Sequence, residues 1–244
     1  RKGLLGPGPL FLIGVAALCV APFLLYPVFV AKVLCFALFA AAFNLLLGYA
    51  GLLSFGHAAF FGFAAYVSAH SAKVWELNPE VGVILGTLTA TGLGLVFGLL
   101  AIRRQGIYFA MVTLALAQMI YFVSLQAPFT HGEDGIQGVP RGRLFGIFDL
   151  SSNISLYFFV LAVFLIGVLA IWRTVNSPFG EVLRSIRENE PRAISLGYDT
   201  DRYKLLAFVI SATLSGLAGA TKVLVFQLAS LTDVAWQMSG EVVL

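Results

Sequence analysis

The sequence predicts an all-α membrane protein, a polytopic bundle of transmembrane helices. Of its 244 residues, 59% are hydrophobic and only 11% are charged, whereas soluble domains are roughly half apolar and about a quarter charged. The mean hydropathy is +0.93. A soluble core of this size cannot hide so many apolar side chains, so lipid must be the solvent for much of the surface.

Apolar runs of membrane-spanning length recur along the whole chain. A helix needs about 20 apolar residues to cross the hydrocarbon core. Six or seven segments fit that length, namely 10–26, 29–47, 52–70, 81–102, 107–127, 154–172 and 205–227. Another apolar run opens at Val242. We therefore treat residues 1–244 as a single transmembrane domain that is incomplete at its C-terminus.

The second and third runs are joined by Gly48-Tyr49-Ala50-Gly51, which carries no charge. The join is either a short loop or a broken, re-entrant helix. Irregular backbone at membrane depth is tolerated only where protein or a water-filled cavity covers it. Gly48 and Gly51 are therefore candidates for the unwound backbone that lines a transport pathway.

Basic residues predict the orientation of the chain. If the N-terminus is cytoplasmic and all seven runs cross, the inside segments hold Arg1, Lys2, Arg103, Arg104, Arg173, Arg184, Arg187, Arg192, Arg202 and Lys204. The outside segments then hold Lys73, Arg141 and Arg143. Lys32 and Lys222 lie near span ends, where long side chains can reach the interface. This excess of basic residues inside favours a cytoplasmic N-terminus.

The loop 173–204 is the one long charged interruption among the apolar runs. Ser177 and Pro178 are typical of a helix start, and Glu181 falls in the first turn, where an acid is favoured. The apolar residues Phe179, Val182, Leu183 and Ile186 share one helical face. Pro191 ends this helix, and a second short one can end near Gly197. The amphipathic helix either packs on its own membrane bundle or docks on a cytoplasmic partner.

Four blocks of sequence resemble one family in order. The segment 177–219, which begins SPFGEVLRSIRENEPRAISLG, resembles the cytoplasmic loop and next span of branched-chain amino acid ABC permeases of the LivM type. NLLLGYAGLLSFGHAAFFGFAAY (44–66), GIYFAMVTLAL (106–116) and GEDGIQGVP (132–140) are similar to further blocks of that family. One departure is the EAA-type loop pattern, which Glu190-Pro191-Arg192-Ala193 before Gly197 keeps only loosely.

The resemblance implies the permease subunit of an ABC importer in the bacterial inner membrane. Its partners would be a homologous second permease, two ABC ATPase subunits and a periplasmic substrate-binding protein, with membrane lipid around the spans and no nucleic acid. ATP and Mg would be used by the ATPases, with no cofactor or metal bound by this chain. The resemblance also turns 173–204 into a coupling loop, with candidate contact residues Phe179, Val182, Leu183, Arg184, Ile186, Arg187, Glu190 and Gly197.

Polar residues inside the apolar runs are few and point to the pathway. An unpaired polar group in hydrocarbon is costly, so each should face a partner helix or a wet cavity. The pathway candidates are Asn44, Gly48, Gly51, Ser54, His57, Thr113 and Gln118. Interhelical hydrogen bonding is the alternative role for Asn44 and His57.

The longest outside segment, 128–152, carries several charges. Either it is a solvated connector, or it is part of the landing surface for a binding protein. Glu133, Asp134 and Arg141 are the candidate docking residues under the second interpretation.

Other functional classes lack their sequence signatures. Carriers driven by ions or protons tend to bury carboxylates, and no acidic residue lies deep in any predicted span. The chain has no GxxxxGK[ST] phosphate loop, and none of the motifs HExxH, GxSxG or paired intramembrane aspartates of a membrane enzyme. The family implies leucine, isoleucine and valine as substrates, while related permeases for urea, short amides or other amino acids stay open.

Overall fold

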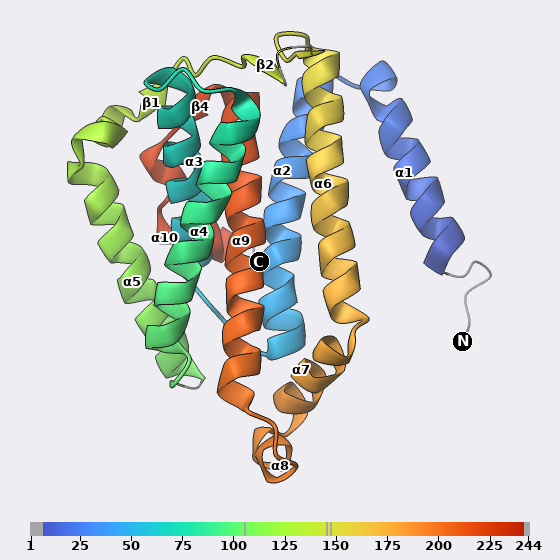
Figure 1. The fold of residues 1–244 in the computed structure, drawn as a ribbon, viewed down its shortest axis with the longest axis vertical. Coiled ribbons are helices and arrows are strands. Elements are labelled where there is room, and N and C mark those ends of the chain that lie inside the picture. The colour runs from blue at the N-terminus through green and yellow to red at the C-terminus, as the bar shows by residue number, and fades with distance from the viewer. Residues whose placement is uncertain (1–6, 105, 145, 147, 242–244) are drawn as a thin grey trace.

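The computed structural model describes residues 7–104, 106–144, 146 and 148–241 and is helical almost throughout (Figure 1). The long helices are α1 (Pro7–Leu24), α2 (Pro27–Asn44), α3 (His57–Lys73), α4 (Pro79–Ala101), α5 (Ile107–Gln126), α6 (Asn153–Val175) and α9 (Thr200–Phe226). Shorter helices are α7 (Pro178–Glu188), α8 (Glu190–Ser195) and α10 (Trp236–Glu241). The predicted all-α bundle is confirmed.

Four strands of two residues each do not change that class. β1 (Ile136–Gln137) pairs antiparallel with β4 (Leu228–Ala229), and Ile136 lies opposite Ala229. β2 (Arg143–Leu144) pairs antiparallel with β3 (Phe148–Asp149). The first pair ties the connection between α5 and α6 to the chain that leaves α9.

Five helices of the described chain are long and apolar enough to cross a membrane. They are Pro27–Ala50, Pro79–Ala101, Ile107–Gln126, Asn153–Val175 and Thr200–Phe226. Five of the seven predicted spans are thus confirmed to within a few residues. Within α1, the stretch Gly14–Leu24 is apolar but shorter than a membrane span. Helix α3 has 17 residues. The apolar run expected from Val242 lies outside the described residues.

Helix α9 forms the centre of the bundle, and 78% of its most apolar stretch is buried. It packs against α2, α3 and α4 (Figure 1). Small residues allow helices in a membrane to approach this closely. A methyl group added to Gly94 would lie 2.5 Å from the Cβ atom of Ala212, and one added to Gly219 would overlap the backbone of Phe61. Both glycines therefore set the distance between helices.

The join after α2 is a broken helix rather than an ordinary loop. Residues Leu45–Ala50 continue α2 as a π-helix, and Gly51 ends it with a φ of +71°. A positive φ strains any residue with a Cβ atom, so glycine suits this position. Residues 51–54 then run without regular structure, and α3 begins at His57. The predicted start of the third span at residue 52 is therefore wrong by five residues.

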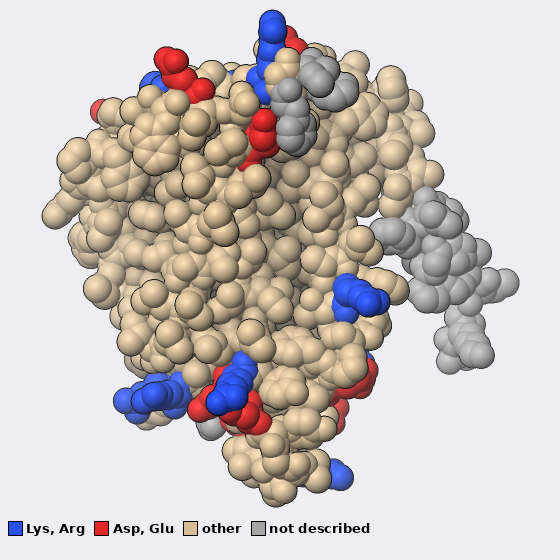
Figure 2. Space-filling model, in the orientation of Figure 1, with Lys and Arg blue, Asp and Glu red and all other residues tan. Residues whose placement is uncertain are grey.

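Charged side chains gather toward the two ends of the molecule, with a broad uncharged band between them (Figure 2). We call the end with α7 and α8 the α8 end, and the opposite end, with β1 and β4, the β1 end (Figure 1). The predicted inside loops meet at the α8 end and the predicted outside loops at the β1 end. Lys222 is an exception, because it is buried rather than reaching an interface.

Candidate functional site

Helix α7 packs on its own bundle through its apolar face. Ser177 occupies the N-cap position and Pro178 the first turn, as predicted. The Ser177 hydroxyl, however, donates to the carbonyl oxygen of Thr174 rather than capping α7. Leu183 and Ile186 are buried against the spans. These two predicted coupling residues thus face the bundle, where they hold α7 in place.

Two other predicted coupling residues are partly buried on α7, and one of them contacts α9. Phe179 is half-buried and stacks on Tyr203 of α9, with ring centroids 5.6 Å apart. Val182 is also half-buried. The first turns of α7 and α9 are therefore joined by an aromatic pair.

Arg187 connects α7 to the broken helix. Its guanidinium donates to the carbonyl oxygen of Gly48. Its aliphatic stem passes over Gly51, where an added Cβ atom would lie 2.9 Å from the Arg187 Cγ atom. Glycine at position 51 is thus favoured for two reasons, its positive φ and the close approach of the Arg187 side chain. The structure brings a predicted coupling residue and two predicted pathway residues into one contact.

Arg184 lies on the same side of α7 and covers the ring of Tyr49, with 5.1 Å between its guanidinium carbon and the ring centroid. A pocket of about 540 Å³ is lined by Gly48, Tyr49, Arg184, Arg187 and Glu188. A second pocket of about 460 Å³ reaches Gly51, Leu52, Glu190 and Lys204. The α8 end thus opens beside the broken helix.

Glu190 ties the coupling loop to the start of α9. Its carboxylate pairs with Lys204, and the Thr200 hydroxyl donates to it at 3.3 Å. The Lys204 side chain is only 4% exposed and that of Glu190 19% exposed. This buried pair fixes α8 relative to α9.

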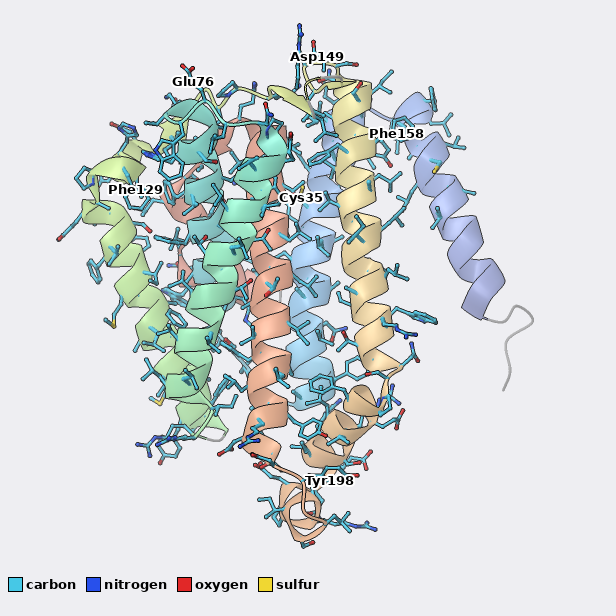
Figure 3. All side chains as sticks on the ribbon, viewed as in Figure 1. Cys35, Glu76, Phe129, Asp149, Phe158 and Tyr198 are labelled. Atoms are coloured by element: carbon cyan, nitrogen blue, oxygen red, sulfur yellow. The ribbon has the colours of Figure 1, made fainter. Side chains whose placement is uncertain are left out.

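The second short helix predicted after Pro191 is confirmed as α8, and Gly197 ends it with a φ of +89°. The Asn189 side chain caps α8 by accepting from the backbone N–H of Arg192 at 3.1 Å, a cap that the sequence reasoning missed. Ile194, Leu196 and Tyr198 are exposed apolar residues here, and Tyr198 lies at the tip of the molecule (Figure 3). This apolar tip was also missed.

The unwound segment before α3 is held by polar contacts. The Thr113 hydroxyl accepts from the backbone N–H of Phe55 at 3.2 Å and donates to the Ala110 carbonyl at 2.9 Å. Ser54 accepts from the backbone N–H of Gly56 at 3.1 Å. Ser54 and Thr113, both predicted for the pathway, are fully buried. They satisfy the backbone groups that the break in the helix leaves unpaired.

His57 is buried between helices, whereas Asn44 is exposed. The Nε2 atom of His57 lies 2.8 Å from the Ser211 hydroxyl, which donates to the carbonyl of Ala42. His57 thereby joins α3 to α9 and, through Ser211, to α2. The Asn44 side chain is exposed and lies over Gly48, where an added Cβ atom would be 2.8 Å from its Oδ1 atom.

Helix α10 returns to the broken region from the β1 end (Figure 1). The Ser239 hydroxyl accepts from the backbone N–H of Ala58 at 2.8 Å and donates to the Phe55 carbonyl at 3.2 Å. The rings of Phe55 and Trp236 meet edge to face, with centroids 6.4 Å apart. Helix α10 and the irregular segment before α3, which are distant in sequence, therefore meet at the start of α3.

Lys222 and Asp233 form a buried ion pair at the β1 end. Their side chains are 4% and 3% exposed. The Asp233 carboxylate also accepts from the backbone N–H of Ser230 at 3.2 Å and from its hydroxyl at 3.1 Å. Asp233 is thus a buried carboxylate, although it lies outside the predicted spans. Paired and hydrogen-bonded, Asp233 holds the returning chain on α9.

The connection 128–152 is a packed cap as well as a solvated connector. Ile136, Val139 and Leu150 are buried. Hydrogen bonds from Ser151 lower the pKa of the exposed Asp149 carboxyl, which lies at the edge of this cap (Figure 3). The connection therefore contributes to the core of the β1 end.

The three predicted docking residues differ in environment. Arg141 donates to the carbonyl oxygens of Leu224 and Val225, at 3.2 and 3.4 Å, and to Asn153 at 3.0 Å. It therefore caps the end of α9. Glu133 and Asp134 are exposed. Glu133 lies in a pocket of about 400 Å³ together with Gln118, the last of the predicted pathway residues.

Comparison with known proteins places the chain in a family. Residues 28–243 match the family described as the permease component of a branched-chain amino acid transport system. High-affinity branched-chain amino acid transport system permease proteins LivM from Salmonella typhimurium and Escherichia coli are each 30% identical over 199 residues, or 72% of this chain. That alignment covers 47% of each relative, so the chain spans about half their length. No solved structure matches it.

The family match, the apolar helices and the broken helix describe the same region of sequence. Residues 28–243 include nearly all of the five membrane-crossing helices, the α7–α8 element and the broken segment between α2 and α3. The chain is a multi-pass membrane protein that belongs to the branched-chain amino acid transport system permease family.

Proposed function

We propose that this chain is a permease subunit of a binding-protein-dependent ABC importer, which moves leucine, isoleucine and valine into the cytoplasm. The family match over residues 28–243 supports the transport role. Under this proposal the chain has no ATPase site of its own. Two partner ATPases hydrolyse ATP with Mg, and a homologous second permease completes the pathway.

The contact of Arg187 with the broken helix is the observation that carries the coupling mechanism. A displacement of α7 reaches the carbonyl of Gly48 directly through the Arg187 side chain. The buried pair of Glu190 and Lys204 carries the same displacement to α9. Packed elements with few soft joints move as rigid bodies. A push on α7 and α8 would therefore shift both the unwound segment and the central helix.

The exposed residues of α7 and the apolar tip of α8 are the surface offered to an ATPase. Ile194, Leu196 and Tyr198 are exposed beyond the spans, where lipid does not cover them in the proposed orientation. Arg184 and Arg187 are also exposed on α7. A protein interface is typically an apolar centre with a polar rim. This surface has that composition.

In this proposal the α8 end faces the cytoplasm and the β1 end the periplasm, across the bacterial inner membrane. Arg103, Arg104, Arg173 and Arg202 all lie toward the α8 end, which fits the preference for basic residues inside. Exposed Glu133 and Asp134 then face the binding protein. Cysteine labelling of the two ends in intact cells would test the orientation.

Uptake of labelled leucine tests the transported substrate. Cells that carry the chain with its partner subunits should accumulate leucine, and cells that lack this chain should not. Excess isoleucine or valine should compete, and excess urea should not. Competition by urea or short amides instead would assign the chain to another branch of the permeases. Leucine uptake that is independent of the chain would remove the substrate claim.

The coupling role has its own test in reconstituted liposomes. Charge reversal at Arg184 and Arg187 should weaken ATPase association, because both side chains are exposed to solvent at the α8 end. The same change removes their contacts with Gly48 and Tyr49, so transmission to the broken helix should be lost as well. The readouts are co-purification of the ATPase and substrate-stimulated ATP hydrolysis. The matched control is charge reversal at Arg103 and Arg104, which are exposed at the same end but outside the α7–α8 element. Full stimulation in the Arg184/Arg187 variant would contradict the coupling role.

A further inference from the structure

A pocket at the β1 end gathers polar side chains that lack partners. It has a volume of about 400 Å³ and lies between α5, the turn that holds Glu133, and α10. Gln118, Tyr121, Glu133 and Gln237 line it. The side chains of these four residues form no hydrogen bond with any other residue that the structure describes. Their donors and acceptors are therefore available to a ligand.

The remaining wall of the pocket is apolar except at Thr232, whose hydroxyl lies 2.7 Å from that of Ser230. Leu231, Ala235 and Trp236 contribute it, and the Trp236 indole is held by the edge-to-face contact with Phe55. Ligand pockets of about 300–1,000 Å³ typically combine an apolar wall with a few polar groups that fix orientation. This pocket has a volume in that range and combines an apolar wall with a few polar groups.

The pocket runs from the surface into the membrane-spanning region. Glu133 is exposed at its outer rim. Gln118 lies about 12 Å along α5 from the end of that helix, given a rise of about 1.5 Å per residue. Beyond Trp236, the Ser239 hydroxyl bridges Phe55 and Ala58. Helix α10, which forms one wall of the pocket, therefore packs against the segment between the broken helix and α3.

We propose that this pocket binds a zwitterionic α-amino acid with an apolar side chain before it passes the broken helix. Glu133 pairs with the ammonium group of the ligand. The amide N–H groups of Gln118 and Gln237 donate to its carboxylate, and Trp236 covers its side chain. This proposal rests on the proposed function, which it extends from a transported class to a binding site.

The assignment of the ammonium to Glu133 follows from charge. Among the lining residues, Glu133 carries the only formal charge. A cationic group is therefore drawn to the rim, and the amides receive the carboxylate deeper in the pocket. An amide has no charge to neutralise, so the protein can hold it in the spanning region at lower cost than a lysine or arginine.

The test is equilibrium binding of tritiated leucine to the complete transporter in nanodiscs, without the binding protein. The wild-type complex should bind leucine, and Glu133→Gln should weaken binding about tenfold, since a charge-assisted hydrogen bond is lost. Gln118→Leu should weaken it by a similar factor. Trp236→Phe keeps an aromatic wall and should cost less than Trp236→Ala.

Glu76→Gln is the matched control. Glu76 is an exposed carboxylate at the same end of the molecule (Figure 3) but does not line the pocket. Its removal changes the net charge as Glu133→Gln does, so it should leave leucine affinity unchanged. Competition with 4-methylpentanoate, which lacks the amino group, adds a second readout. The wild type should prefer leucine over it, and Glu133→Gln should lose that preference.

The outcomes separate this site from binding-protein docking and from the function itself. Leucine binding to Glu133→Gln with wild-type affinity would overturn the site. So would a defect that appears only with the binding protein present and is shared by Asp134→Asn. Absence of leucine uptake by the wild-type complex would instead defeat the proposed function, before any pocket variant is compared.

Discussion

The two ends of α9 are anchored by the same chemistry in different surroundings. At the α8 end Lys204 pairs with Glu190, whose side chain is 19% exposed. At the β1 end Lys222 pairs with Asp233, whose side chain is 3% exposed. A buried charge that loses its partner costs more than a partly solvated one. The β1 anchor is therefore the rigid one, and the α8 anchor can be rearranged at lower cost.

The difference between the two ion pairs fits a protein in which a conformational change starts at the α8 end. The α8 anchor holds the α7–α8 element, which projects from the bundle and ends in exposed apolar residues. The β1 anchor holds the chain that returns to α10 and meets the broken helix through Ser239. Under the proposed function, the weaker joint faces the ATPase and the stronger joint holds the pathway.

The largest effect is expected from Asp233→Ala. Lys222 would stay buried without a counter-charge, and the capping bonds to Ser230 would be lost. The free energy of unfolding should fall by about 3–5 kcal/mol, measured by thermal unfolding in detergent. The double variant Lys222→Met/Asp233→Asn removes both charges and keeps a capping oxygen, so it should recover most of the loss. A wild-type melting temperature for Asp233→Ala would contradict the β1 anchor.

Gly219→Ala should have the next largest effect. The added methyl group would overlap the carbonyl of Phe61 and push α3 away from α9. Overpacking of this kind costs about 1–3 kcal/mol, again measured by thermal unfolding. Gly92→Ala is the control, because no atom lies within 4 Å of the added Cβ. Equal melting temperatures for the two variants would show that α3 and α9 are not closely packed there.

Glu190→Ala tests the softer anchor. Lys204 would lose its buried partner and Thr200 its acceptor, but water already reaches Glu190. We expect a loss of about 1–2 kcal/mol in the free energy of unfolding, smaller than for Asp233→Ala. Substrate-stimulated ATP hydrolysis should fall as well, because α8 is no longer fixed to α9. A loss larger than that of Asp233→Ala would reverse the ranking of the two anchors.

Leu196→Asp should change stability least, within about 0.5 kcal/mol, because the side chain is exposed. It should nevertheless reduce ATPase association, since it places a charge at the apolar tip of α8. Co-purification of the ATPase and thermal unfolding measure the two effects separately. Ser195→Asp, at the neighbouring exposed position, adds the same single negative charge without removing an apolar side chain and is the control. Normal association in Leu196→Asp would exclude the tip as the contact.

Much of the fold follows from local pattern. Apolar run length predicts α2, α4, α5, α6 and α9 to within a few residues, because each span must satisfy its own backbone in lipid. The proline and apolar spacing after Ser177 predict α7, and Pro191 and Gly197 bound α8. These signals lie within one helical turn of the elements they specify, so the sequence can be interpreted without knowing the packing.

The sequence predicts less of the candidate site than of the fold. Gly48 and Gly51 were predicted at the broken helix, but their contact with Arg187 joins positions more than a hundred residues apart. The same holds for Ser239 with Ala58, and for Arg141 with the end of α9. No periodicity encodes such pairs, because each depends on how the helices pack. The spacing of Leu183 and Ile186 also predicts an apolar helical face, but it does not predict whether the bundle or a partner protein covers that face.

By itself, the sequence determined that lipid surrounds this chain, which segments cross it, and that one amphipathic element interrupts them. Hydrophobicity and turn chemistry are local properties, so composition and spacing suffice. Only the tertiary structure decided that α9 is central, that Lys222 pairs with Asp233, and that the α8 tip rather than Leu183 and Ile186 is exposed. These features depend on which surfaces meet after folding, and a buried charge or an exposed leucine has no local signature in the chain.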